Sequence, residues 1–358
     1  MNFDTSEEQE LLQETIRQFL EGECPPPRVR EIFDGEGHDP ALWKGMVELG
    51  LAGLAVPEEH GGAGLEILDL ALVTEELGYG SAPGPFFGHA LATVALAAGG
   101  SDAQKQQWLP KLATGDAVGS VAFGEPGGAW LPEDWSVTGS SDQLSGRKSF
   151  VPGAELADLF IVGTEGGGLA LVERGAEGVS IEPYDGVDRT RRMATLVLDG
   201  AEAERLEQGA AAAARVRDTA LVLAAADAFG VASRLVEMSV AYAGTREQFG
   251  VTIGHFQALK HQLADMAVAI EPSRGLWWFA AHALDHLPEE APRAAAVAKA
   301  HITDVAMQIA RDAVESHGGI GFTWECDVQI WFKRVLLDRA WMGLPDLHRE
   351  RAAELAGW

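Results

Sequence analysis

The spacing of apolar residues changes twice along the chain, and this limits the possible folds more than any other feature. Up to about residue 118, apolar residues recur every three or four positions, as in helices that bury one stripe. From about Ser120 to Ala201, short β-rich runs separated by Gly and Asp indicate strands. The helical spacing returns from about Ala203. We therefore predict an α+β fold with an N-terminal helical domain (1–118), a middle β-domain (119–204) and a C-terminal helical bundle (205–358).

Residues that interrupt helices separate the expected elements. Pro25–Pro27 and Gly61–Gly62 divide the early helical region. The predicted N-terminal helices cover 7–20, 40–49, 67–77 and 104–112, and the predicted strands include 159–162, 169–172 and 195–198.

Composition excludes several classes of protein. The 358 residues are 47% hydrophobic, which is enough for a large core in two or three domains. The net charge of -27, without a basic tract, argues against nucleic acid as a partner. Only Cys24 and Cys326 are present, and neither a signal peptide nor a membrane span is visible, so we expect a cytoplasmic protein away from the membrane. His255 and His261 are six residues apart and lack metal-ligand spacing, so no metal site is expected.

The segment Arg246–Gly250 joins a basic residue, an aromatic residue and a glycine between two apolar helices, expected at about 221–238 and 253–270. A guanidinium at such a break can bind phosphate oxygens bidentately. The ring of Phe249 can cover a nucleobase or an isoalloxazine. Alternatively, Arg246 caps a helix carbonyl and Phe249 packs against the protein.

A second glycine-rich segment, Glu315–Glu325, follows another apolar helix. Gly318 and Gly319 let the backbone approach a ligand closely and expose its N–H donors. Considered alone, this turn is also compatible with an ordinary helix end.

The two segments, in this order, resemble the acyl-CoA dehydrogenase family. Further similar segments cover much of the chain: 49–62, 104–116, 122–127 and 146–158. The resemblance implies FAD as cofactor, an acyl-CoA as substrate and a role for Arg246, Phe249, Gly318 and Gly319 in holding the FAD of a neighbouring subunit. It places Glu315 where the family usually has Gln, and a carboxylate there would repel pyrophosphate.

The positions where the family has its catalytic base do not match in this sequence. The family removes the α-proton of the substrate with a carboxylate and transfers the β-hydride to the flavin. Ungapped counting places Met342 at one known base position and Ala220 at the other, and neither side chain can accept a proton. Asp227 remains as the candidate base, since desolvation in its apolar segment would make it more basic. Alternatively, Asp227 pairs with an Arg at a helix interface.

The residues that the resemblance places beside the flavin ring also depart from the family pattern. Phe150 stands where a Trp usually stacks on the ring, while Gly124 and Pro152 replace residues with a hydroxyl. Two functions are therefore considered. The first is FAD-dependent α,β-dehydrogenation of an acyl-CoA thioester, with Asp227 or a partner's carboxylate as base. The second is a catalytically degenerate subunit that supports assembly and a partner's cofactor site.

The oligomeric state follows only from the resemblance. The Phe150–Pro152 variant and the short C-terminal end resemble subunits of actinobacterial acyl-CoA dehydrogenases that oxidise steroid side-chain CoA thioesters. A homo-oligomer and a heteromer with a second acyl-CoA dehydrogenase subunit both stay open, as does a role in lipid or steroid catabolism.

Overall fold

The computed structural model describes residues 4–140 and 142–358, which form two compact units. Among these described residues, the first unit comprises 4–34, Ala71–Ala82 and Leu221–Trp358, and the second comprises Gly35–Leu70, 83–140 and 142–220. The predicted α+β order of helices, then strands, then helices is confirmed. The division into three domains at residues 118 and 204 stays a prediction.

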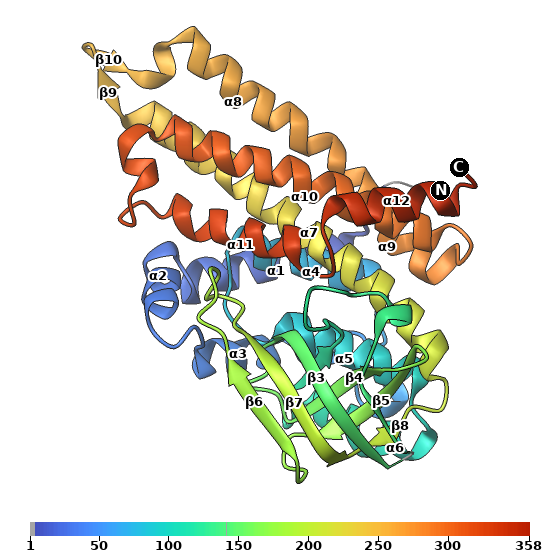
Figure 1. Cartoon of the computed structure of the whole chain (residues 1–358). Coiled ribbons are helices and arrows are strands. Elements are labelled where there is room, and N and C mark those ends of the chain that lie inside the picture. The colour runs from blue at the N-terminus through green and yellow to red at the C-terminus, as the bar shows by residue number, and fades with distance from the viewer. Residues whose placement is uncertain (1–3, 141) are drawn as a thin grey trace. The chain divides into compact units, whose positions relative to one another are not determined.

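The second unit contains two four-stranded sheets. One has the strand order β1-β4-β5-β8 with β1 parallel to β4, and the other has the antiparallel order β2-β3-β7-β6. Figure 1 shows the long strands β3 and β7 side by side. Side chains such as Val151, Phe160 and Leu196 form their common core. The elements are α3 (Pro40–Glu48), α5 (Phe86–Gly99), α6 (Asp102–Ala113), β1 (Gly119–Ala122), β2 (Thr138–Gly139), β3 (Gln143–Pro152), β4 (Leu159–Thr164), β5 (Gly168–Glu173), β6 (Val179–Pro183), β7 (Met193–Glu202) and β8 (Glu204–Arg205).

The first unit is built from helices. Its longest complete helix, α10, packs against α8, α9, α11 and α12 (Figure 1). The elements are α1 (Glu7–Glu23), α2 (Pro26–Asp34), the part of α4 (Ile67–Tyr79) from Ala71, the part of α7 (Gly209–Thr245) from Leu221, β9 (Glu247–Gln248), β10 (Val251–Thr252), α8 (Gln257–Ile270), α9 (Arg274–His286), α10 (Ala291–Ser316), α11 (Val328–Ala340) and α12 (Pro345–Leu355).

Helix α7 lies against α4 in the first unit. A Cβ atom at Gly230 would overlap the carbonyl oxygen of Glu75, so only glycine allows the two backbones to approach this closely. Among the described residues, α7 alone is long and apolar enough to cross a membrane, yet 83% of its most apolar stretch is buried inside the protein. A buried core helix accounts for this composition.

The four predicted N-terminal helices and the three predicted strands are confirmed, with small differences at their ends. Two helices of the N-terminal region, α2 and α5, were not predicted. The proline-rich segment that ends α1 also begins α2, because Pro is favoured in the first turn of a helix. Helix α5 is buried around nearly its whole circumference, so its sequence shows no amphipathic period.

Candidate functional site

Four non-glycine residues in the described part of the chain have left-handed backbones: Ser81, Phe150, Phe249 and Met342 have φ angles of 47°, 56°, 54° and 61°. Bulky residues rarely adopt this conformation, and when they do, it is often at functional sites. Phe150 and Phe249 are predicted cofactor residues, and Met342 occupies a predicted base position. Three of the four left-handed residues therefore lie at positions that the sequence analysis named, and Ser81 does not.

The first motif forms a short hairpin at the end of α7. The amide of Arg246 donates to the carbonyl of Tyr242 at 2.8 Å, and the amide of Ile253 donates to the carbonyl of Arg246 at 2.7 Å. These bonds close the hairpin of β9 and β10, with Phe249 at its tip. Phe249 is 92% exposed and contacts Phe256 edge-on at 6.1 Å. The hairpin therefore presents an aromatic ring to solvent.

The second motif is the glycine turn that follows α10. Glu315 is exposed in the last turn of α10, and a 3₁₀ turn runs from Gly318 to Phe322. A Cβ atom at Gly318 or Gly319 would meet nothing within 4 Å, so both glycines face open space. Phe322 is also exposed. This turn offers accessible backbone next to an exposed ring.

A ring stack joins the two motifs within the first unit. The rings of Tyr242 and His317 lie 4.5 Å apart with an interplanar angle of 22°. His317 Nδ1 donates to the carbonyl of Ala313 at 2.7 Å, which leaves Nε2 without the proton in the neutral ring. Burial lowers the pKa of His317 and favours this neutral form. Sequence reasoning missed this pair.

Asp227 lies in α7, fully buried and paired with Arg334 of α11. Arg334 donates from Nη2 to Oδ1 at 2.6 Å and from Nε to Oδ2 at 2.8 Å. Its Nη1 donates to the carbonyl of Ala82 at 2.8 Å. This is the helix-interface ion pair that the sequence left open as the alternative to a base. The sequence signal for Arg334 is its place in the buried stripe of α11, which includes Ile330 and Trp331.

The two positions expected for the base hold buried apolar side chains. Met342 is 2% exposed in the turn after α11, and its carbonyl accepts a bond from His348 at 3.0 Å. Ala220 is fully buried in α7. Neither side chain has an atom that can take a proton.

The predicted ring-stacking residue Phe150 lies in an aromatic cluster of the second unit. Its ring is 5.8 Å from Trp130 and 5.4 Å from Tyr184, and the residue is 40% exposed. A Cβ atom at Gly124 would lie 2.9 Å from Trp130, so glycine is needed where the family pattern has a larger residue. Phe150 thus keeps an accessible surface, but Trp130 takes up space beside it.

Near this cluster, Lys148 forms a buried ion pair with Glu125. Glu125 also accepts hydrogen bonds from the amide and hydroxyl of Ser136 at 2.9 and 2.6 Å. Burial lowers the pKa of Lys148 to about 8, although Glu125 opposes the shift. The pair links β3 to the segment after β1 and fixes the backbone that carries Gly124 and Phe150.

Comparison with known proteins assigns this architecture. Residues 6–116 match the N-terminal domain of acyl-CoA dehydrogenases, and residues 198–356 match their C-terminal domain. The chain belongs to the acyl-CoA dehydrogenase family.

Individual relatives within the acyl-CoA dehydrogenase family span nearly the whole chain. Acyl-CoA dehydrogenase IpdE2 of Mycolicibacterium smegmatis is 36% identical over 92% of this chain and 93% of its own length. A variant of the Tcur3481-Tcur3483 steroid ACAD has a TM-score of 0.90 at 32% identity and covers 98% of both chains. The ChsE4-ChsE5 complex of Mycobacterium tuberculosis contains a chain with a TM-score of 0.91 at 27% identity, covering 100% of this chain and 99% of that one.

Acyl-CoA dehydrogenases use FAD, and the two halves of this chain fit that cofactor unequally. In the first unit, the open backbone of Gly318 and Gly319 and the exposed ring of Phe249 suit phosphates and an aromatic group. In the second unit, Phe150 offers a ring surface, while Gly124 provides no side-chain donor. The residues of the first unit fit the cofactor better, except for Glu315, whose exposed carboxylate beside the glycine turn would repel a pyrophosphate.

Proposed function

We propose that this chain is a subunit of an FAD-dependent acyl-CoA dehydrogenase that desaturates an acyl-CoA thioester between its α- and β-carbons. Arg246 and Phe249, with the glycine turn at Gly318 and Gly319, would hold FAD bound mainly to another subunit. When bound, FAD supplies the acceptor for the β-hydride. The exposed ring of Phe249 and the accessible backbone at Gly318 and Gly319 support this role.

We further propose that another subunit supplies the base. The observation that carries this step is the pairing of Asp227 with Arg334, because both carboxylate oxygens already accept a guanidinium N–H. Met342 and Ala220 offer no replacement. The relatives include steroid-type and two-component acyl-CoA dehydrogenases, which supports a heteromer acting on a lipid or steroid CoA thioester.

The proposal includes a cytoplasmic location. Cys24 and Cys326 form no disulfide in the structure, which agrees with reduced thiols.

The flavin spectrum of the purified protein tests this function. We expect the chain alone to bind little FAD, and the chain coexpressed with an acyl-CoA dehydrogenase paralogue to be yellow and to bleach when an acyl-CoA is added. A chain that binds FAD alone and bleaches with an acyl-CoA would contradict the need for a partner's base.

The role of the hairpin is tested in the coexpressed assembly. Arg246→Gln and Phe249→Ala should each weaken FAD binding about tenfold, because they remove a phosphate contact and a ring contact. Trp358→Ala is the matched control, since Trp358 is similarly exposed, at 90%, but lies outside both motifs. Equal FAD content in all three variants would remove the hairpin from the cofactor site.

A further inference from the structure

The segment that joins the glycine turn to α11 has little burial to hold it in place. It runs from Thr323 to Asp327, and residues 323–325 are exposed. Asp327 is the N-cap residue of α11. Exposed backbone with few buried contacts opens locally at a low cost in free energy. The position of the glycine turn relative to α11 therefore depends on contacts from other elements of the first unit.

Arg30 of α2 supplies such contacts. Its Nε and Nη2 donate to Oδ1 of Asp327 at 2.8 and 2.6 Å, and its Nη1 donates to the carbonyl oxygen of Trp324 at 2.7 Å. The side chains of Arg30 and Asp327 are 22% and 35% exposed, so water weakens their bonds less than at an open surface. One rigid guanidinium thus holds both the start of α11 and the backbone two residues after the glycine turn.

The side chain of Trp324 adds ring contacts to these hydrogen bonds. Its ring lies 5.1 Å from the ring of Phe33, a buried residue of α2. The guanidinium carbon of Arg30 lies 5.0 Å from the centre of the Trp324 ring, and Nζ of Lys333 lies 4.6 Å from it. A cation over an indole ring is a favourable contact. Helix α2 therefore holds the segment after the turn through both charge and ring contacts.

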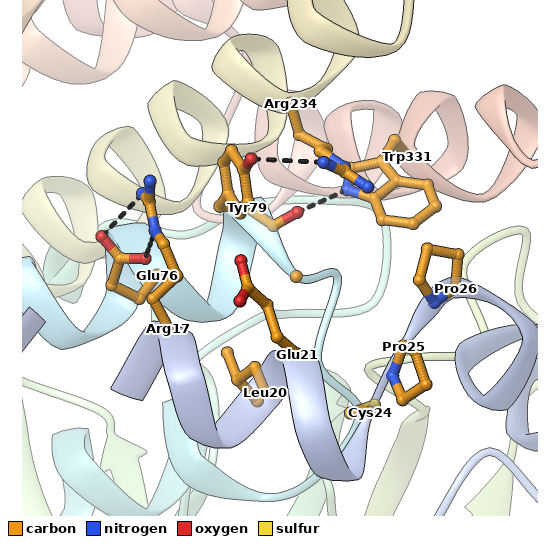
Figure 2. A pocket seen from close by; sticks show the side chains of 11 residues that line it. Arg17, Leu20, Glu21, Cys24, Pro25, Pro26, Glu76, Tyr79, Arg234 and Trp331 are labelled. Carbon is orange, nitrogen blue, oxygen red and sulfur yellow. Dashed lines mark hydrogen bonds and ion pairs between the residues drawn. The ribbon is translucent and has the colours of Figure 1, made fainter. Parts of the chain in front are cut away.

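The start of α2 has no such hold on α11. Pro25 and Pro26 line a cavity of about 130 Å³ together with Trp331 of α11 (Figure 2). Side chains that border a cavity lose van der Waals contacts on that side. The bonds of Arg30, about one helical turn after Pro26, are therefore the contacts that fix the start of α11 against α2.

We propose that Arg30 is a positioning residue for FAD, because it holds the turn at Gly318 and Gly319 where the backbone can receive the phosphates of the cofactor. Arg30 acts through Trp324 and Asp327 and does not touch FAD itself. The inference rests on the proposed function, in which the turn holds FAD. It assigns a role to a residue that lies 294 positions before Trp324, outside both sequence motifs.

Hydrogen–deuterium exchange in the coexpressed assembly tests whether Arg30 holds the turn. Arg30→Gln removes the charge and should speed exchange of the amides at 318–327 about fivefold, while exchange in α10 stays unchanged. Arg28→Gln is the matched control, since Arg28 lies in the same helix and pairs with the exposed Glu31. Unchanged exchange at 318–327 in Arg30→Gln, or equal acceleration throughout the first unit, would overturn the proposal.

The FAD affinity of the same assembly tests the link to the cofactor. We expect Arg30→Gln to weaken FAD binding about fivefold and Arg28→Gln to leave it unchanged. Arg30→Lys keeps a cation that can pair with Asp327, but it lacks the planar fork that also reaches the carbonyl of Trp324. This variant should therefore regain the denaturation midpoint of the unaltered protein without regaining its FAD affinity.

Two results would remove Arg30 from this role. The first is an Arg30→Gln assembly that binds FAD as tightly as the unaltered one. The second is an Arg30→Lys assembly in which stability and FAD affinity recover together, because Arg30 would then act through stability alone. Arg30→Lys keeps the ion pair, so it tests the proposal even if Arg30→Gln does not fold.

The outcome for the unaltered assembly separates this inference from the proposed function. If the unaltered assembly binds no FAD, the proposed function is contradicted, and the role of Arg30 toward FAD fails with it. If the unaltered assembly binds FAD and Arg30→Gln binds it equally well, only the role of Arg30 fails.

Discussion

Replacing Asp227 by Asn removes one charge of a buried ion pair while preserving the shape of the side chain. Arg334 would then keep its charge, at 3% side-chain exposure, where water cannot replace the lost carboxylate. The two contacts of 2.6 and 2.8 Å are charge-assisted, and each contributes about 1.5–3 kcal/mol to the stability. Breaking one side of a buried pair costs about 3–5 kcal/mol. We therefore expect Asp227→Asn to lower the free energy of unfolding by about 4 kcal/mol.

Chemical denaturation and thermal melting followed by circular dichroism measure this loss. We expect Tm to fall by about 10 °C. The control is Asp304→Asn, because Asp304 pairs with Arg339 and Arg349 at the partly exposed surface, where ion pairs contribute about 1 kcal/mol or less. Adding Arg334→Met to Asp227→Asn removes the unpaired cation and should restore at least half of the lost stability.

One result would refute the assignment of Asp227 to a structural pair. If Asp227→Asn keeps its free energy of unfolding within about 0.5 kcal/mol but the assembly no longer bleaches with acyl-CoA, Asp227 is the base. A large loss of stability with an intact bleaching rate in the surviving folded protein supports the ion pair.

Three further predictions concern other described contacts. Burial raises the pKa of Glu75 from 4.5 to about 7, so the native state binds more protons than the unfolded state between these pH values. The free energy of unfolding should therefore fall by about 3 kcal/mol as pH rises from 4.5 to 7. Glu75→Gln should flatten this profile when denaturation is measured at several pH values. Lys148→Met leaves Glu125 buried without its cation and should lower the free energy of unfolding by about 3–5 kcal/mol, whereas an unchanged denaturation midpoint would contradict the importance of the pair. Tyr242→Leu removes the stack on His317 and should weaken FAD binding by the coexpressed assembly several-fold. Tyr242→Phe keeps the ring and should bind FAD like the unaltered protein. If the Leu and Phe variants bind FAD with equal affinity, the stack does not position the two motifs.

Several elements could be predicted because their causes are local. The helix at Glu7–Glu23 begins with a capping box formed by Ser6 and Gln9, and an amphipathic stripe continues it. Helix α5 could not be found in this way, since burial on nearly all sides removes the contrast between its faces. The spacing of apolar residues reveals only helices that have one face in the core and the other in solvent.

The site shows the same division. The two motifs were recognisable from Arg246, Phe249 and the glycines at 318 and 319, because a turn depends on the types of a few consecutive residues. The partner of Asp227 was not, because Arg334 is 107 residues away and only helix packing brings the two together. The Tyr242–His317 stack also joins segments far apart in sequence.

The sequence alone thus determined the α+β order of elements, the family and the two motifs suited to FAD, because these depend on short-range patterns of polarity and backbone freedom. Tertiary structure decided what those patterns leave open. It paired Asp227 of α7 with the guanidinium of Arg334, and it buried the side chains of Met342 and Ala220 at the two expected base positions. The physical reason is that the environment of a charge is set by the residues that folding brings next to it, and burial makes the presence or absence of a partner decisive.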